Sequence, residues 1–399
     1  MADRINIIIP TLGSSSWTGG FTYQSNLIEA LRKREDVRIY LVSNLEGKSS
    51  SPIEGGSLDV LFSRIKRNYR AVTFKLSMLF NGFDKGLSKR LKRFDNSSLN
   101  ALFTLNHAHL FSKNNILKLY WIPDFQHIHL SYLFKKEEIV ERNLRFLEGC
   151  KHADVIIVSS QNAKKDLARF APEFLHKSRV SNFVSNVPEN IWEKDPSILT
   201  SKYGIPEKFF YLPNQFWKHK NHITVLEALR KLKQKGVSPQ IVFTGNPTDY
   251  RNPEYIEELK KYIRDWGLSD QLFILGMVDH DDVLLLIRQC IAIINPSLFE
   301  GWSTTVEESK SIGKRAILSD IEVHREQHPA VCDFFKPKDS DELSLILEKR
   351  WCELNSGPDI IMETQAREDL VKRISAYGDN FIQIIKDFSR EKSEKEHDS

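Results

Sequence analysis

The sequence predicts an α/β protein made of two doubly wound domains, each built on a parallel sheet. Short apolar runs alternate with longer helical stretches, which is typical of strands joined by covering helices. A polar, proline-punctuated stretch from Asn186 to Pro206 interrupts this pattern, and the pattern then starts again. The 399 residues suffice for two or three domains, and 41% hydrophobic content excludes a largely disordered chain.

The first unit, residues 1–190, contains four apolar runs that we expect to be strands. They are Asn6–Pro10, Val37–Ser43, Leu117–Pro123 and Asp154–Ser160. The first two lie on either side of a stretch with helical periodicity, in which Leu27, Ala30 and Leu31 share one face. We expect helices over Phe21–Arg34 and Gln161–Phe170.

The second unit, residues 200–360, repeats the alternation more regularly. Expected strands are Phe209–Pro213, Gln240–Gly245, Leu272–Gly276, Ile291–Pro296 and Ala316–Ser319. Expected helices are Asn221–Lys235, Pro253–Trp266, Asp281–Gln289 and Thr305–Gly313. The charged tail, residues 389–399, is expected to be disordered.

Charge and cysteine content limit the classes of partner and compartment. The 57 basic residues against 53 acidic ones give a net charge of +4, too balanced for a dedicated nucleic-acid binder. Four cysteines in no CxxC spacing favour a reducing compartment over a disulfide framework. No run approaches 18 uninterrupted apolar residues. We therefore expect a cytoplasmic protein.

The stretch richest in chemistry follows the expected strand Ile291–Pro296 and opens the next helix. Glu300 and Gly301 precede this helix, and Glu308 lies in its first turns. A helix N-terminus at the carboxyl edge of a parallel sheet offers free N–H groups to an anion. Carboxylates placed there accept hydrogen bonds from sugar hydroxyls. Glycine lets the backbone approach a ligand closely.

Glu300 and Glu308, with seven residues between them, resemble the paired glutamates of retaining nucleotide-sugar glycosyltransferases of family four. The run from Glu300 to Gln327, EGWSTTVEESKSIGKRAILSDIEVHREQ, is similar to that of bacterial members that build surface polysaccharides. The resemblance extends from the first strand to about Tyr377. It implies the GT-B fold, with two Rossmann-like domains facing a central cleft and a final helix, about 366–388, that completes the first domain.

The resemblance also assigns roles to residues of the second unit. Glu300 would bind the transferred sugar and Glu308 the nucleotide ribose. The amides of Trp302, Ser303 and Thr304 would face the sugar and the diphosphate. Lys220, in the turn after Phe209–Pro213, aligns with a phosphate-gripping lysine, and a lysine there stabilises a departing diphosphate. Gln215 stands where the family has an arginine, and Lys218 is a candidate for replacing that charge. A solvated basic turn is the other interpretation.

Two motifs of the first unit match the same family. His127 follows Asp124 at the family's Asp-x-x-His spacing, which implies a contact with the transferred sugar; a structural histidine is the alternative. His129 receives no role. Gly19 and Gly20, expected before the first helix, match the family's glycine loop and are candidate ligand contacts, although an ordinary turn explains them equally well.

Helix capping is a competing explanation for several acidic patterns. Asp279-His280-Asp281 has the D-x-D spacing with which another transferase fold holds a divalent ion. It precedes an apolar helix, so we interpret these aspartates as caps, like Asp339 and Asp341 before Leu343. We expect no metal and no cofactor. The capping-box signature also fits Thr304 with Glu307 and Thr305 with Glu308, but it leaves Glu300 unexplained.

The segment Arg64–Arg93 carries ten basic residues against one acid, with aromatic and apolar residues between them. It is either a solvated helical face or a peripheral contact with the inner, anionic face of a membrane. No nucleic-acid motif accompanies it, so we expect no nucleic-acid partner.

The expected activity is transfer of a hexose from a nucleotide-sugar donor to a glycan or lipid-linked acceptor. The family resemblance favours mannose or a related hexose. The second unit would hold the donor and the first the acceptor. We expect anomeric configuration to be retained. Two alternatives remain: a nucleotide-sugar epimerase of the same two-domain architecture, and a non-catalytic membrane or nucleic-acid adaptor.

Overall fold

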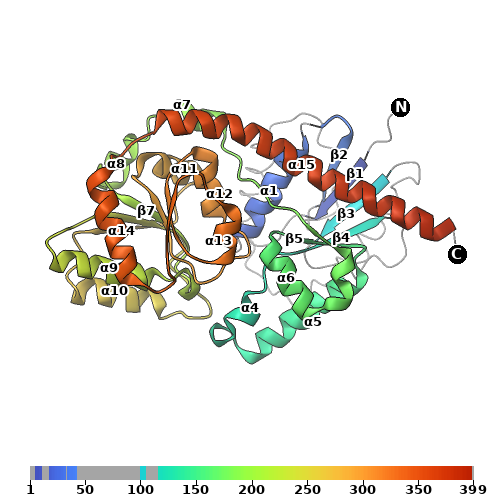
Figure 1. Ribbon diagram of the computed structural model, residues 1–399, viewed down its shortest axis with the longest axis horizontal. Coiled ribbons are helices and arrows are strands. Elements are labelled where there is room, and N and C mark those ends of the chain that lie inside the picture. The colour runs from blue at the N-terminus through green and yellow to red at the C-terminus, as the bar shows by residue number, and fades with distance from the viewer. Residues whose placement is uncertain (1–4, 11–17, 33, 43–98, 105–115, 398–399) are drawn as a thin grey trace.

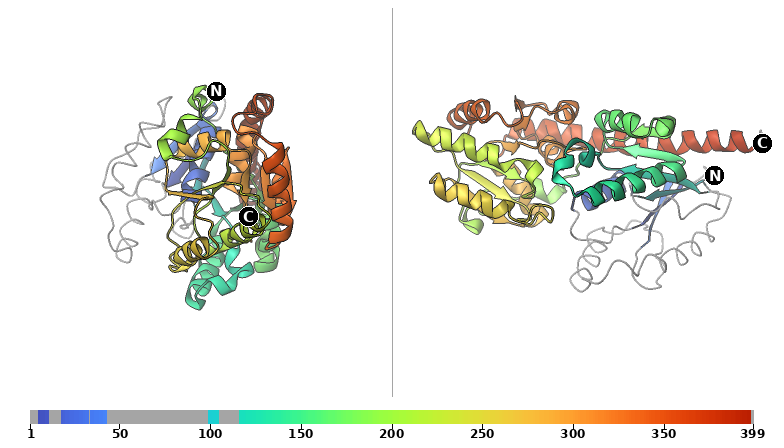
Figure 2. Two further views of the ribbon diagram at one scale, coloured as in Figure 1. Left: turned by 90° about the vertical axis from the view of Figure 1, so that its left-hand side faces the viewer. Right: turned by 90° about the horizontal axis from the view of Figure 1, so that it is seen from below.

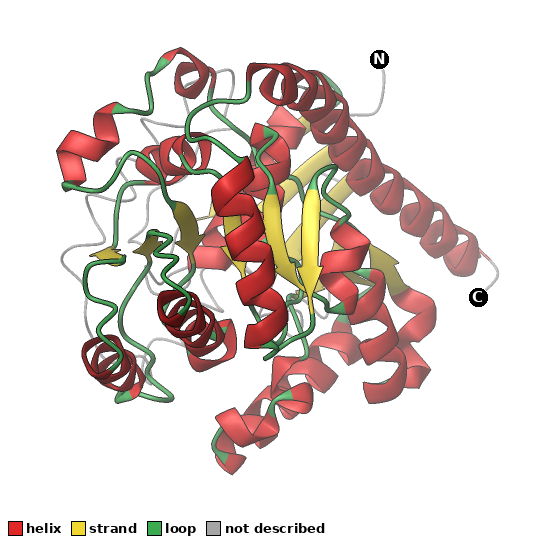
Figure 3. Ribbon diagram, turned by 60° about the vertical axis from the view of Figure 1, so that its left-hand side comes forward, coloured by secondary structure: helices red, strands yellow, loops and turns green. Residues whose placement is uncertain are grey.

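A computed structural model describes residues 5–10, 18–32, 34–42, 99–104 and 116–397. Within these ranges the chain forms two six-stranded sheets, and every strand pair is parallel (Figure 1). Parallel strands need crossover connections, and in the described parts of the chain helices supply most of them. Figure 3 shows the strands with helices on both sides. The fold is therefore GT-B, two doubly wound α/β domains. The segment Arg64–Arg93 lies outside the described residues.

The first sheet has the order β2-β1-β3-β4-β5-β6. Its strands are β1 (Ile5–Pro10), β2 (Val37–Val42), β3 (Leu99–Thr104), β4 (Leu117–Ile122), β5 (Val155–Val158) and β6 (Ser178–Val180). The helices of this half are α1 (Thr18–Arg32), α4 (Gln126–His129), α5 (Lys136–His152) and α6 (Gln161–Phe170). Strands β3 and β6 and helix α5 were not expected from the sequence.

Gly19 and Gly20 lie inside the first turn of α1, because this helix begins at Thr18 instead of Phe21. The expectation that they form a turn before the helix is wrong. The first N–H groups of a helix have no intrahelical partner, so glycine is tolerated there more readily than its low helix propensity suggests.

The second sheet has the order β12-β11-β10-β7-β8-β9. Its strands are β7 (Phe210–Pro213), β8 (Ile241–Thr244), β9 (Leu272–Gly276), β10 (Ile293–Asn295), β11 (Ala316–Ser319) and β12 (Cys332–Phe335). Its helices are α9 (His222–Gln234), α10 (Tyr255–Asp265), α11 (His280–Gln289), α12 (Thr304–Ile312), α13 (Glu322–Gln327) and α14 (Ser340–Glu353). The chain runs outward in one direction through β7, β8 and β9 and in the other through β10, β11 and β12. The strand order therefore switches between β7 and β10.

Short helices α7 (Glu189–Glu193) and α8 (Ile198–Tyr203) join the two halves, and the long helix α15 (Ile360–His397) joins them again. Figure 2 shows α15 running along one side of the molecule from the second sheet past the first. Its buried Phe381 packs edge-to-face on Phe103 of β3, at 5.5 Å between ring centroids. A Cβ on its Gly378 would lie 2.8 Å from the carbonyl oxygen of Ala30, so α15 and α1 are closely packed.

The expected disorder of residues 389–399 is wrong as far as His397, where α15 ends. Lys, Glu and Arg are good helix formers, and they continue a helix that is already anchored. Ion pairs also tie this end to the first domain: Lys392 with Asp154 at 3.6 Å and Arg179 with Glu391 at 4.0 Å. Among the described residues, no helix is both long and apolar enough to cross a membrane.

Candidate active site between the two domains

Lys220 and Glu300 meet at the switch point of the second sheet. Lys220 ends the turn after β7, and Glu300 lies in the loop of residues 296–303 after β10, which we call the Glu300 loop. Because β7 and β10 are neighbours, their carboxyl ends bring these loops together, at the place where open α/β sheets bind ligands. The Lys220 Nζ lies 2.6 Å from Glu300 Oε1, with side chains 16% and 10% exposed.

The charge of Glu300 is stabilised despite its burial. Burial alone would raise the pKa of this carboxyl, but the ammonium of Lys220, His324 and a hydrogen bond from Ser297 outweigh it, so the pKa is lowered. Glu300 is therefore an ionised carboxylate at neutral pH. Removing one partner of an ion pair this well shielded from water is costly, because it leaves a buried charge without its counter-charge.

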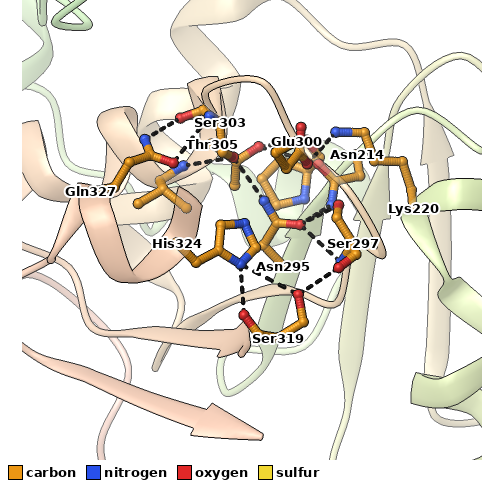
Figure 4. A network of polar contacts seen from close by, with 12 residues as sticks. Asn214, Lys220, Asn295, Ser297, Glu300, Ser303, Thr305, Ser319, His324 and Gln327 are labelled. Carbon is orange, nitrogen blue, oxygen red and sulfur yellow. Dashed lines mark hydrogen bonds and ion pairs between the residues drawn. The ribbon is translucent and has the colours of Figure 1, made fainter. Parts of the chain in front are cut away.

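A network of buried amides and hydroxyls fixes the Glu300 loop (Figure 4). Asn295, fully buried at the end of β10, donates to Ser303 Oγ at 2.8 Å. Its Oδ1 accepts from Ser297 Oγ at 2.7 Å and from Asn214 Nδ2 at 3.2 Å. A side chain bonded on both its donor and acceptor atoms holds one orientation, so both ends of the loop are tied to the same strand end.

Ser303, not Thr304 or Thr305, is the N-cap of α12, and its Oγ accepts from Val306 N–H at 3.4 Å. The capping-box interpretation is therefore wrong, and it does not account for either glutamate. The Ser303 amide was expected to face a ligand, but it donates to Gln327 Oε1 at 3.0 Å, so this expectation is also wrong. Thr304 is the first residue of α12, at the positive end of the helix.

Glu308 points from α12 toward α11. Its Oε1 lies 2.8 Å from Nε2 of His280, the first residue of α11, and Glu308 is 5% exposed. Its carboxylate is thus held in place by an imidazole that is itself half exposed.

The aspartates that the sequence analysis interpreted as helix caps do not all have that role. Asp279 occupies the N-cap position of α11 without a side-chain capping bond, so that interpretation is wrong for Asp279. Asp281 pairs with Lys194 at 2.9 Å. Asp339 does cap α14, accepting from Glu342 N–H at 2.9 Å, as expected. Among the described residues, no group of three or more His, Cys, Asp or Glu side chains is arranged to hold a metal ion.

The turn after β7 places its other candidates differently. Gln215 is half-buried, and Lys218 is exposed with its amide bonded to Asp249 Oδ2 at 3.2 Å. The guanidinium of Arg251, a residue that the sequence analysis missed, lies over the Trp217 ring at 5.3 Å and donates to Gln126 Oε1 of the first domain at 3.0 Å. The sequence could have indicated Arg251 through its position in the loop after β8, at the same edge of the sheet.

The first domain meets the Glu300 loop at Pro123 and Asp124. A Cβ on Gly301 would lie 2.1 Å from the Pro123 carbonyl oxygen and 2.8 Å from the Asp124 Cβ. The neighbouring Trp302 donates from Nε1 to the Phe183 carbonyl at 3.0 Å. At Gly301 the two domains are thus too close to leave room for a side chain.

His127 and His129 occupy different environments although both lie in α4. His127 has no exposed surface; its Nε2 bonds to Asn143 at 2.9 Å, and burial lowers its pKa. This burial does not fit the expected contact with a sugar. His129 is 36% exposed, bonds to Asp166 at 2.8 Å, and packs its ring 4.9 Å from that of Phe299, next to Glu300. The histidine that reaches the Glu300 loop is therefore His129.

The comparisons with known proteins agree with this geometry. Residues 199–349 match the family model described as glycosyl transferases group 1. The matched residues are less than half of the chain and lie in its second domain. The match covers β7 to β12, with Lys220, Glu300 and Glu308, so the paired glutamates lie within the matched domain.

The chain is similar to two curated mannosyltransferases. It is 26% identical over 205 residues to the serotype-specific mannosyltransferase WbdA of Escherichia coli, which covers 50% of the chain and 24% of WbdA. It is 22% identical to the O-antigen chain mannosyltransferase RfbU of Salmonella typhimurium, over 79% of the chain and 82% of RfbU. The chain thus spans about a quarter of WbdA and most of RfbU.

Solved structures match the whole chain. HepE of Anabaena, in complex with UDP and glucose, has a TM-score of 0.68 at 13% identity and covers 96% of the chain and 100% of HepE. The sucrose-phosphate synthase of Thermosynechococcus elongatus has a TM-score of 0.66 at 14% identity, over 99% and 100%. At these identities the likeness shows the fold alone.

Proposed function

We propose that the protein is a retaining hexosyltransferase of bacterial surface-polysaccharide synthesis, using a nucleotide-sugar donor and a glycan or lipid-linked acceptor. The observation that carries the proposal is the Lys220–Glu300 ion pair at the switch point of the second sheet, beside the start of α12. The names of WbdA and RfbU support mannose as the transferred sugar. The protein would act at the cytoplasmic face of the membrane.

The second domain would bind the donor through three charged groups. Lys220 would exchange the carboxylate of Glu300 for the diphosphate, and the positive end of α12 would add its attraction. Glu300, released from Lys220, would accept hydrogen bonds from the sugar hydroxyls. Glu308 would accept from the ribose, which requires His280 to share or yield its 2.8 Å contact.

The first domain would present the acceptor and cover the donor. Pro123 and Asp124 touch Gly301, and His129 lies against Phe299, so this part of the first domain is in place to face the transferred sugar. We assign to His129 the role first expected of His127, because His127 has no exposed surface.

Transfer would proceed on one face of the sugar and without a metal ion. The bond between the anomeric carbon and the diphosphate oxygen breaks as the bond to the acceptor oxygen forms on the same side. A phosphate oxygen of the leaving group takes the acceptor's proton. Lys220 and the start of α12 would stabilise the negative charge that develops on the diphosphate.

A panel of nucleotide sugars tests the proposal. Only a ligand that binds the folded state raises the unfolding temperature, so the thermal shift should single out one donor. That donor is then incubated with and without acceptor. Conversion of the sugar without acceptor would identify an epimerase, and no shift with any nucleotide sugar would leave only a non-catalytic protein.

A further inference from the structure

Helix α13 has two faces that bind different domains. Glu322 and Glu326, one turn apart, point toward α6 of the first domain, and the two helices lie side by side (Figure 1). His324 and Gln327 point inward, 0% and 1% exposed, toward the Glu300 loop (Figure 4). A single six-residue helix thus contacts both the opposite domain and the loop that carries Glu300.

The outer face closes the N-terminus of α6. The Glu326 carboxylate accepts the backbone N–H groups of Gln161 at 2.7 Å and Asn162 at 3.2 Å. These first-turn amides have no partner within their own helix, and a carboxylate there also suits the helix dipole. Glu322 adds Lys165 at 2.8 Å. Contacts this exposed are individually weak, which suits an interface that must open to exchange substrates.

The inner face holds the backbone at the start of α12. Gln327 accepts the Ser303 N–H at 3.0 Å and donates to the Ser303 carbonyl at 2.9 Å. It also donates to Glu307 Oε1 at 3.2 Å, and Glu307 in turn pairs with Arg373 of α15. The Ser303 carbonyl also accepts the Glu307 N–H at 3.1 Å within α12, so of the two backbone groups it is the N–H that is held by the Gln327 side chain alone.

Helix α13 is ordered by tertiary contacts: those of its two faces and, within the second domain, a bond from Lys310 Nζ to the Gln327 carbonyl at 2.6 Å. It is too short to be stable in isolation, and its N-cap residue, Ile321, makes no side-chain capping bond. Glu326 and Gln327 are adjacent in the chain, so releasing the first loosens the second. When the domains separate, α13 loses its contact with α6. Gln327 then keeps its bonds to Ser303 only where α13 stays helical.

We propose that α13 makes the order of the Glu300 loop depend on closure of the two domains, with Glu326 as the positioning residue. Closure places Glu326 on α6, this steadies Gln327 on Ser303, and the loop then presents Glu300 in one geometry. The proposal rests on the proposed function only in assuming that this loop contacts the donor. It assigns a coupling role to a helix that touches no substrate.

Hydrogen exchange of the Ser303 amide in the full chain tests the coupling without any donor. Glu326→Ala should raise the exchange rate by about fivefold or more, the lower end of usual coupling between sites. Glu326→Gln, which keeps a carbonyl acceptor, should give a smaller rise. The control is Glu348→Ala, which removes an ion pair with Lys235 at 3.4 Å within the second domain and should change nothing.

Unchanged exchange at Ser303 in both Glu326 variants would overturn the proposal. So would an equal rise at amides throughout the second domain, because that would indicate general destabilisation. In the Gln327→Ala background, Glu326→Ala should have no further effect on Ser303. A failure of the proposed function would appear separately, as absent transfer by the wild type.

Discussion

Lys220 Nζ lies 2.6 Å from Glu300 Oε1, and this ion pair joins the two loops that meet at the switch point of the second sheet. The same two groups would bind the diphosphate and the sugar of the donor. In the free protein each therefore holds the other in place and neutralises its charge. The pair affects both stability and activity, and the two effects can be separated by titration.

The contribution of Glu300 to the free energy of unfolding should depend on pH with opposite signs in the wild type and in Lys220→Met. The pKa of Glu300 is lowered from its ordinary value near 4.5, so its stabilising contribution is complete above about pH 4.5 and is lost as pH falls through the lowered pKa. In Lys220→Met, burial is opposed far less, and the pKa should rise. The contribution is then present at low pH and is lost as pH increases.

Denaturant unfolding across this pH range measures the effect. Lys220→Met should cost about 3–5 kcal/mol at neutral pH, since it leaves a buried carboxylate unpaired, and should recover part of that cost in acid. Glu300→Gln, which cannot titrate, is the control. Parallel pH profiles of Lys220→Met and wild type would contradict the assignment. Glu300→Gln also breaks the ion pair, but its amide oxygen can still accept from the Lys220 Nζ, so it should destabilise the fold less than Lys220→Met and is the better variant for activity assays.

Gly301→Ala should block domain closure without unfolding either domain. The added Cβ would lie 2.1 Å from the Pro123 carbonyl oxygen, so the loops cannot approach as they do in the structure. We expect transfer to fall about a hundredfold, because small displacements of reacting groups are costly. Small-angle scattering should show a larger radius of gyration at an unchanged unfolding temperature. A wild-type radius together with wild-type transfer would contradict the close contact.

The two histidines of α4 should separate stability from activity. His127→Ala should lower the unfolding free energy by about 2–4 kcal/mol, because it leaves a cavity among buried rings. Its transfer rate per folded molecule should stay near wild type. His129→Gln keeps a donor near Asp166 but removes the ring from Phe299. It should lower kcat/KM about tenfold, equivalent to about 1.4 kcal/mol, with little change in stability. If instead His127→Ala lowered the transfer rate per folded molecule and His129→Gln did not, His127 would be the residue that contacts the sugar.

A chelator should leave transfer unchanged. The aspartates of the D-x-D pattern are at the start of α11, and Asp281 is engaged by Lys194. Assays with and without EDTA, on protein stripped of metal beforehand, measure the dependence. Loss of activity that manganese or magnesium restores would show that the metal-independent mechanism is wrong.

Apolar runs alternating with helical stretches predicted five of the six strands of the second sheet, although β10 is only three residues long. The sequence placed Lys220 and Glu300 in loops after two strands, and the neighbouring positions of β7 and β10 explain why these loops meet. Strand β3 was missed because Asn100 interrupts a short apolar run. Helix α13, EVHREQ, was missed because six residues with Val323 as their apolar residue show no helical period.

Side-chain direction was the least predictable feature of the site. His127 and His129 are two residues apart, and only the packing of Phe125, Phe134 and Phe146 around His127 shows which one is buried. The role of Ser303 as N-cap likewise depends on where α12 begins, one residue before the position expected. Local signatures fitted several caps, and tertiary contacts selected one.

The most direct test of the account is the rate at which purified Glu300→Gln transfers sugar from the donor identified by thermal shift. The variant keeps the shape of the side chain, removes its charge and replaces one acceptor oxygen by an NH2 donor. We predict a transfer rate about 10²–10³-fold below that of the wild type, with the fold preserved, because an interaction with the transferred sugar in the transition state is lost. Transfer near the wild-type rate would contradict the central role of Glu300 and of its pairing with Lys220.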